Sequence, residues 1–324
     1  MLPSFSYRRP TTIDEAVAQL ALGDARPLAG GTDLLGCLRD GVLATPKLVS
    51  LSRIKALHGI TPRDGGLHIG ALTTISEIAA DETIRTRYTA LAQAAASAAS
   101  PQLRNQGTLG GNLCQKPRCW YYRGSFHCLR KGGEMCYAFG GENQYHAILG
   151  GDRCFYVHPS DMAAALLALD ATVHVAGSGH SREISLAGFF IPPAQDPQRE
   201  TVLKPDELVT GVSLPQPSTA MRSSYRKVRA RGAWDFALAG VALALRFSGR
   251  TVTEARVVLS GVAPVPWRAH KAEVAITGTK LDDAVLRRAA EAAVAKAEPL
   301  AGNGYKVALV RGLLEEQLAA LARG

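Results

Sequence analysis

A glycine-rich loop followed directly by a long cysteine-rich segment constrains this chain more than any other sequence feature. The loop covers residues 102–112 and includes Gly107, Gly110 and Gly111. Glycine lets the backbone approach a bulky ligand and expose its N–H groups, which is the chemistry that binds a pyrophosphate. The cysteines that follow can bind metal. Together the two features predict two redox cofactors held side by side.

A second candidate phosphate loop lies near the N-terminus. Residues 27–29 are expected to form a short buried strand, and Gly30 and Gly31 lead from it to the apolar start of a helix at Leu34. A helix N-terminus beside glycine N–H groups favours an anion, so the two loops together can bind the two phosphates of a dinucleotide. Neither loop has the glycine spacing of a Rossmann turn.

The cysteine-rich segment covers residues 113–157 and is too long and too poor in apolar periodicity to order by itself. It contains Cys114, Cys119, Cys128, Cys136 and Cys154, five of the six cysteines. Zinc sites usually have C-x-x-C pairs, and none occurs here. Disulfides need an oxidising compartment, and no signal peptide is recognised. A 4Fe-4S cluster takes four thiolates and suits the wide spacing, but the spacing does not select four of the five.

Length and composition limit the class of protein. A chain of 324 residues exceeds a comfortable single core and predicts two or three domains. Hydrophobic residues make up 47% and charged residues 20%, without an apolar run long enough to span a membrane. The net charge of +9 comes from scattered basic residues accompanied by acidic ones, which does not indicate nucleic-acid binding.

Hydrophobic periodicity predicts helices and strands that alternate without a strict repeat. Thr12 and Glu15 form a capping-box pattern at the start of a helix that continues to Leu20. Further helices are expected at 91–99, 162–169, 282–296 and 313–321, and strands at 47–51, 67–71, 172–175, 207–212, 236–247 and 252–259. The proline pair at 215 and 217 marks a domain boundary. These elements predict an α+β fold.

Five segments carry a resemblance to a known family. They are residues 29–34, 104–112, 159–161, 225–228 with Arg231 and Asp235, and 259–264. The chain resembles the FAD-binding medium subunit of the xanthine dehydrogenase family of molybdenum hydroxylases, in particular the type with an additional 4Fe-4S cluster. The resemblance implies a two-subdomain FAD-binding domain of the PCMH type over 1–217, with subdomains at about 1–55 and 56–217 and the iron-sulfur insertion at 113–157. It implies a C-terminal α+β domain over 218–324, of the CO dehydrogenase flavoprotein C-terminal type.

The same resemblance implies the ligand-binding residues. FAD is expected to contact Leu28, Ala29, Gly30, Gly31, Thr32, Asp33 and Leu34, then Asn105, Gly107, Thr108, Gly110, Gly111 and Asn112, and finally Ser160, Asp161 and Lys227. The cluster is expected at Cys119, Cys128, Cys136 and Cys154, which leaves Cys37 and Cys114 as small buried side chains. The segment from Tyr225 to Asp235 is expected near the flavin, where a cation can stabilise an anionic reduced ring. No residue is assigned a catalytic role, and His68, His174 and His270 are interpreted as structural.

By resemblance, the chain is an electron-transfer subunit of a heterotrimer. A large subunit holds the molybdenum cofactor, a small subunit holds two 2Fe-2S clusters, and electrons leave FAD for an external acceptor. The long segment between Cys136 and Cys154 favours an aldehyde oxidoreductase over a hydroxybenzoyl-CoA reductase. A standalone FAD oxidoreductase with a zinc-bound loop is the alternative from a different class. The absence of a recognised signal peptide predicts a cytoplasmic protein, unless a partner's signal exports the complex.

Overall fold

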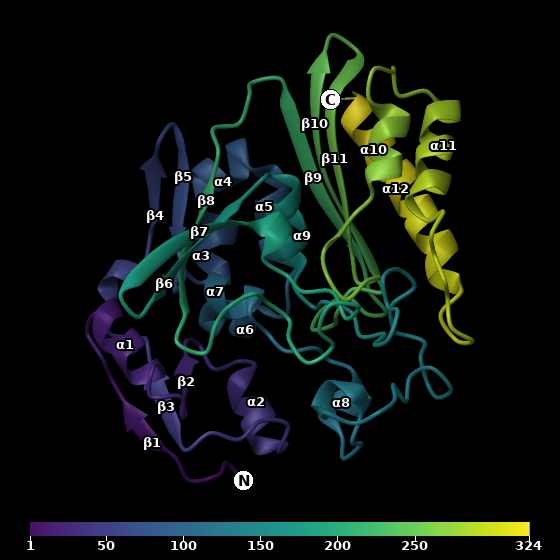
Figure 1. The fold of residues 1–324 in the computed structure, drawn as a ribbon. Coiled ribbons are helices and arrows are strands. Elements are labelled where there is room, and N and C mark those ends of the chain that lie inside the picture. Colours follow the sequence, from purple (N-terminus) through teal and green to yellow (C-terminus); the bar gives the residue numbers. More distant parts are fainter. Residues whose placement is uncertain (324) are drawn as a thin grey trace.

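The computed structural model describes residues 1–323 and contains three β-sheets (Figure 1). The N-terminal sheet is parallel, with strand order β1-β3-β2. Its elements are β1 (Ser6–Arg8), α1 (Ile13–Leu20), β2 (Ala25–Leu28), α2 (Leu34–Arg39) and β3 (Lys47–Ser50). The buried face of α1 packs with Val49 and Leu51 in a small core that also includes Leu72 and Leu208. This unit places the first glycine loop between β2 and α2.

The second sheet has five antiparallel strands in the order β4-β5-β8-β6-β7. The strands are β4 (Ile60–Arg63), β5 (Gly66–Gly70), β6 (Thr172–Gly177), β7 (His180–Ser185) and β8 (Leu208–Leu214). The helices beside it are α3 (Ile75–Ala80), α4 (Glu82–Arg87), α5 (Thr89–Ser97), α6 (Pro101–Gln106), α7 (Leu109–Leu113) and α9 (Asp161–Ala168). Every residue of α9 is buried, because this helix lies between two layers.

The third sheet is antiparallel with the order β12-β11-β10-β9. It consists of β9 (Met221–Val228), β10 (Ala239–Ser248), β11 (Thr251–Ser260) and β12 (Trp267–Arg268). The helices α10 (His270–Ile276), α11 (Asp283–Ala293) and α12 (Tyr305–Arg323) cover one face, and α5 and α9 cover the other (Figure 1). Residues 239–245 of β10 are all buried because both faces of the strand are covered.

The observed elements confirm the predicted α+β class, with instructive differences in detail. The last helix begins at Tyr305, eight residues before the predicted start, and buries Lys306 and Val310 there. The Thr12 hydroxyl caps α1 as predicted, but the Glu15 carboxylate accepts from the backbone N–H of Thr11 instead of Thr12. Strands β1, β4 and β7 were not predicted, since most of their residues are exposed and give little apolar signal.

The cysteine-rich segment contains little regular structure beyond α8 (Trp120–Arg123) and the 3₁₀ helix η2 (Leu129–Lys131). Its later part is fixed to the C-terminal domain by hydrogen bonds. The side-chain amide of Asn303 donates to the carbonyls of His146 and Ala147, and the N–H of Glu298 donates to the carbonyl of Ile148. Within residues 1–323, no helix combines the length and the apolar character that crossing a membrane requires.

Candidate functional site

The two glycine loops lie against each other. Position 30 requires glycine, because a Cβ there would collide with the carbonyl oxygen of Gln106 at the end of α6. Gly31 has a φ of +75°, a backbone conformation that is strained for residues with a side chain. A Cβ on Gly111 would lie 3.9 Å from the Cβ of Ala29, so the second loop also approaches the first. The predicted pairing of the loops is therefore present in the tertiary structure.

The two loops differ in the backbone donors that they offer. In the first turn of α7, the N–H groups of Leu109 and Gly110 donate to the carbonyls of Thr73 and Ala71, and that of Gly111 donates to the Thr108 hydroxyl. The expected exposure of the N–H groups of Gly107, Gly110 and Gly111 is therefore wrong, because they donate to the Leu103 carbonyl, the Ala71 carbonyl and the Thr108 hydroxyl. Among residues 1–323, no backbone acceptor is found for the N–H groups of Gly31, Thr32 and Asp33. The first loop keeps the donors that an anion requires.

Replacing Gly30 by Ala is expected to separate the loops. The new Cβ meets a backbone carbonyl that cannot rotate away, so the cost should lie at about 3 kcal/mol, the upper end for overpacking. We expect a lower thermal unfolding midpoint and loss of bound flavin, measured by calorimetry and by FAD released on denaturation. Gly36→Ala in α2 is the matched control, because a Cβ there meets nothing within 4 Å. Equal flavin content in both variants would contradict the loop contact.

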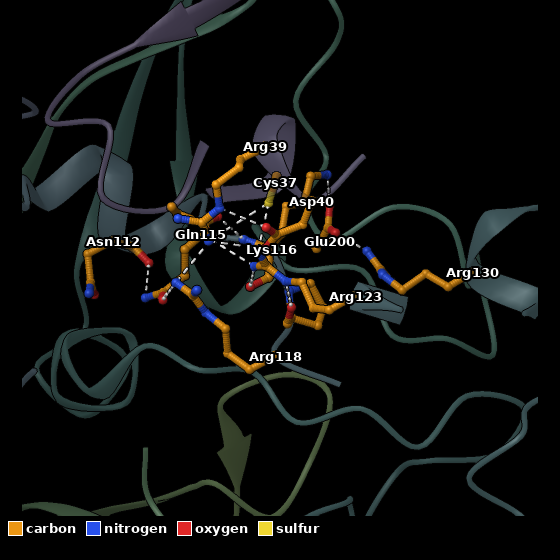
Figure 2. A network of polar contacts seen from close by, with 12 residues as sticks. Cys37, Arg39, Asp40, Asn112, Gln115, Lys116, Arg118, Arg123, Arg130 and Glu200 are labelled. Carbon is orange, nitrogen blue, oxygen red and sulfur yellow. Dashed lines mark hydrogen bonds and ion pairs between the residues drawn. The ribbon is translucent and has the colours of Figure 1, made fainter. Parts of the chain in front are cut away.

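The first loop is connected to the cysteine-rich segment by Asp33, whose partners Lys116, Arg118 and Arg123 are shown in Figure 2. Its carboxylate accepts from the backbone N–H of Lys116 at 2.7 Å, from Arg123 Nη2 at 2.7 Å and from Arg118 Nη2 at 3.0 Å. The Arg123 guanidinium also donates to Cys37 Sγ at 2.9 Å. The side chain of Asp33, predicted to contact the cofactor, therefore holds the insertion on the loop.

The remaining residues of the second loop are held by neighbouring helices. Asn105 accepts at Oδ1 from the Ser76 hydroxyl at 2.6 Å, and Thr108 caps α7. The Ser160 hydroxyl donates to Asn112 Oδ1 and accepts from the N–H of Ala163, so it links the loop to the start of α9. Leu28 ends β2, Ala29 follows it, Leu34 begins α2, and Gly107 ends α6. The structure thus gathers the predicted residues of both loops with Ser160.

Asp161 and Lys227 form a buried ion pair between the two domains. Lys227 Nζ lies 2.7 Å from Asp161 Oδ2, and the side chains are 2% and 6% exposed. The Tyr225 hydroxyl donates to Asp161 Oδ1 at 2.7 Å, and burial raises the pKa of this phenol well above its usual value. The predicted flavin cation thus has a carboxylate partner within the protein, and the pair joins α9 to β9.

The segment 229–237 lies over the ends of α5 and α6, beside the Asp33 network. The Arg229 guanidinium donates to the carbonyl of Ser97 at 3.0 Å, and the N–H of Trp234 donates to the carbonyl of Ala99 at 3.2 Å. The Arg118 guanidinium carbon lies 5.0 Å from the centre of the Phe236 ring. Trp234 is two-thirds exposed and has a φ of +54°. This segment therefore contacts the link between α5 and α6 and the Arg118 side chain, and its expected position near the flavin stays a prediction.

Four cysteines of the insertion line one small cavity. They are Cys119, Cys128, Cys136 and Cys154, the four predicted as cluster ligands. All six cysteines are free thiols. Within residues 1–323, no group of three or more His, Cys, Asp or Glu side chains is arranged as the ligands of a metal ion. The thiols thus surround a shared space that also borders Tyr121, Tyr122, Leu129, Arg130, Tyr137 and Tyr156.

The surroundings of these thiols are largely aromatic. Burial raises the pKa of Cys119 to about 11. Interaction with Cys154 lowers the pKa of the Cys136 thiol, whereas interaction with Cys136 and burial raise the pKa of Cys154, so the two thiols titrate as a pair. Buried thiols that cannot ionise independently are the kind that a metal group converts to thiolates.

A chain of charges connects this cavity with the first loop. Arg130 lies 4.5 Å from the centre of the Tyr156 ring and pairs with Glu200. Glu200 also pairs with Lys116 at 2.6 Å (Figure 2). The backbone N–H of Lys116 in turn donates to Asp33. Burial lowers the pKa of Lys116 to about 8. Sequence reasoning missed Glu200, which lies 70 residues beyond Arg130 in the chain.

The two cysteines outside the predicted ligand set lie elsewhere. Cys37 is buried in α2 and contacts Arg123, whereas Cys114 ends α7. Burial raises the pKa of Cys114 to about 12. Neither residue borders the cavity of the other four thiols.

Family models match nearly the whole chain. The FAD binding domain in molybdopterin dehydrogenase matches residues 3–217, and the CO dehydrogenase flavoprotein C-terminal domain matches residues 223–321. The chain is 38% identical over 329 residues to the aldehyde oxidoreductase FAD-binding subunit PaoB of Escherichia coli, covering 98% of each chain. The chain belongs to the FAD-binding subunits of the molybdenum hydroxylases.

Other relatives of this flavin subunit agree in both sequence and structure. It is 30% identical to the carbon monoxide dehydrogenase medium chain of Hydrogenophaga pseudoflava, over 99% of this chain and 98% of that one. The solved carbon monoxide dehydrogenase of that organism superimposes with a TM-score of 0.79 at 28% identity, covering 99% of both chains. The flavin subunit is thus part of an oxidoreductase complex and binds FAD. These comparisons support FAD, and the 4Fe-4S cluster stays a prediction.

Proposed function

We propose that this flavin subunit transfers electrons through two cofactors, FAD and a 4Fe-4S cluster bound by Cys119, Cys128, Cys136 and Cys154. The observation that carries the proposal is the cavity that these four thiols share. A cubane needs four thiolate ligands at its corners, and the four cysteines that line this cavity can supply them. FAD and the cluster supply two-electron and one-electron redox chemistry when bound.

The role of the protein in this proposal is to hold FAD and the cluster in place. The free N–H groups of Gly31, Thr32 and Asp33 are suited to the negatively charged phosphates of FAD. Asp33, Arg123 and Lys116 hold the insertion against the same loop, which keeps the two sites adjacent. The aromatic rings around the thiols exclude water, because a buried cluster must be protected from solvent.

The proposal extends to partners and substrate. We infer a cytoplasmic heterotrimer with a large molybdenum-cofactor subunit and a small 2Fe-2S subunit, in which electrons pass from the small subunit to this chain and on to an external acceptor. The identity to an aldehyde oxidoreductase subunit, along the full chain, favours oxidation of aldehydes to carboxylic acids. A hydroxybenzoyl-CoA reductase is the alternative within the family.

Metal analysis and spectroscopy of the anaerobically purified chain test the two cofactors together. We expect about four irons per chain, FAD released on denaturation, and an EPR signal after reduction with dithionite. Flavin with zinc, or flavin without metal, would refute the cluster and leave a flavin subunit whose insertion is structural. For the substrate, the assembled complex should oxidise aldehydes; reductive dehydroxylation as its sole activity would establish the reductase instead.

A further inference from the structure

His146 is a buried histidine whose ring points at one of the four thiols. Its Nε2 atom lies 3.3 Å from Cys119 Sγ, and His146 is 3% exposed. The other ring nitrogen, Nδ1, is buried and has no hydrogen-bond partner among residues 1–323. Within residues 1–323, the Cys119 thiol is therefore the hydrogen-bond partner of the His146 ring.

The position of the ring is fixed from several sides. The N–H of His146 donates to the carbonyl of Asn143 at 2.9 Å, and its carbonyl accepts from Asn303 at 3.1 Å. The Trp120 ring packs edge-on, with 5.3 Å between ring centres. The fold already fixes both the backbone and the ring of His146. The hydrogen bond to the thiol therefore requires little further loss of side-chain entropy.

A thiolate is an acceptor only, and Nδ1 of His146 has no hydrogen-bond partner among residues 1–323, so Nε2 is the ring nitrogen placed to donate to Cys119.

We propose that His146 is a positioning residue that donates its Nε2 hydrogen to the Cys119 thiolate and thereby makes the 4Fe-4S cluster easier to reduce. The inference rests on the proposed function, in which Cys119 is a cluster ligand. Reduction adds one electron to the cluster, and no bond forms or breaks. The reduced cluster has one more negative charge, so a hydrogen bond to its ligand stabilises the reduced form more than the oxidised form.

The test is an EPR-monitored redox titration of the full chain with its cofactors. His146→Phe keeps a ring of similar size without a donor, and we expect the ratio of reduced to oxidised cluster at a given potential to fall about tenfold, because a hydrogen bond to a charged group has about that effect. For a one-electron couple this is a shift of about 59 mV to lower potential. His146→Gln retains a side-chain N–H and should recover part of the shift. His127→Phe, at an exposed histidine of the same segment, is the control and should leave the potential unchanged.

The outcomes separate this inference from the proposed function. Wild-type protein without about four irons, or without a reduced-cluster signal, refutes the cluster itself. Wild-type protein with the cluster, together with a His146→Phe variant that keeps its iron and its potential, refutes only the role of His146. Should the Phe variant lose its iron, ENDOR of the reduced wild-type protein labelled with ¹⁵N-histidine decides. An exchangeable proton on a labelled nitrogen coupled to the cluster supports the inference, and its absence overturns it.

Discussion

Replacing Cys136 by Ala is expected to reduce the iron content of the purified chain from about four atoms to nearly none. The thiol lines the cavity together with Cys119, Cys128 and Cys154. A cubane that loses one of four protein ligands exposes an iron site, and the insertion has no other cysteine at the cavity to replace it. Iron analysis and the absorbance of the anaerobically purified protein measure the effect.

The controls are the two cysteines that do not border the cavity. Cys114→Ala and Cys37→Ala should both retain the full iron content and the reduced-cluster EPR signal. Loss of iron in either variant, or full iron in Cys136→Ala, would show that the predicted ligand set is wrong. Flavin content should be recorded for all three variants, because the Asp33 network connects the insertion to the first loop.

Lys227→Met is expected to lower the free energy of unfolding by about 3–5 kcal/mol. The substitution leaves the Asp161 carboxylate buried without its cation, and an uncompensated buried charge has a cost of this size. Denaturant titration followed by circular dichroism measures the change. The pair joins α9 to β9, so the interface between the two domains should weaken first.

Arg226→Met on the same strand is the matched control. Arg226 and Glu316 are 3.7 Å apart and both 56% exposed, and an exposed pair of this kind contributes less than about 1 kcal/mol. The double variant Asp161→Asn with Lys227→Met should recover part of the lost stability, because it removes the unpaired charge. Equal losses in Lys227→Met and Arg226→Met would contradict a stabilising role of the buried pair.

The two loops illustrate how far local sequence can predict a site. Glycine pairs beside helix starts identified both loops, and the structure brings them into contact at Gly30 and Gln106. The sequence did not indicate which loop keeps free N–H groups. That depends on residues 71–73, which pack against α7 and use the donors of Leu109 and Gly110. A packing contact between distant segments has no local sequence pattern, so only the structure distinguishes the loops.

Asp33 and Lys227 show the same limit for side chains. Motif resemblance placed both at the cofactor, yet the structure pairs Asp33 with Arg118 and Arg123, and Lys227 with Asp161. Charged residues near a binding site need partners when they are buried, because an isolated buried charge is costly. The partners come from other elements of the chain, and their identity cannot be deduced from spacing.

The sequence by itself determined the α+β class and the two glycine loops, which depend on hydrophobic periodicity and on glycine where a backbone approaches closely. The membership of the family and the choice of the four cysteines that line one cavity came from the resemblance of several motifs to a known family. The tertiary structure alone decided the direction of His146 toward Cys119, the ion pairs of Asp33, Glu200 and Asp161, and the burial of Lys306. Each of these joins residues far apart in the chain, and their energies depend on burial and distance, which exist only once the chain has folded.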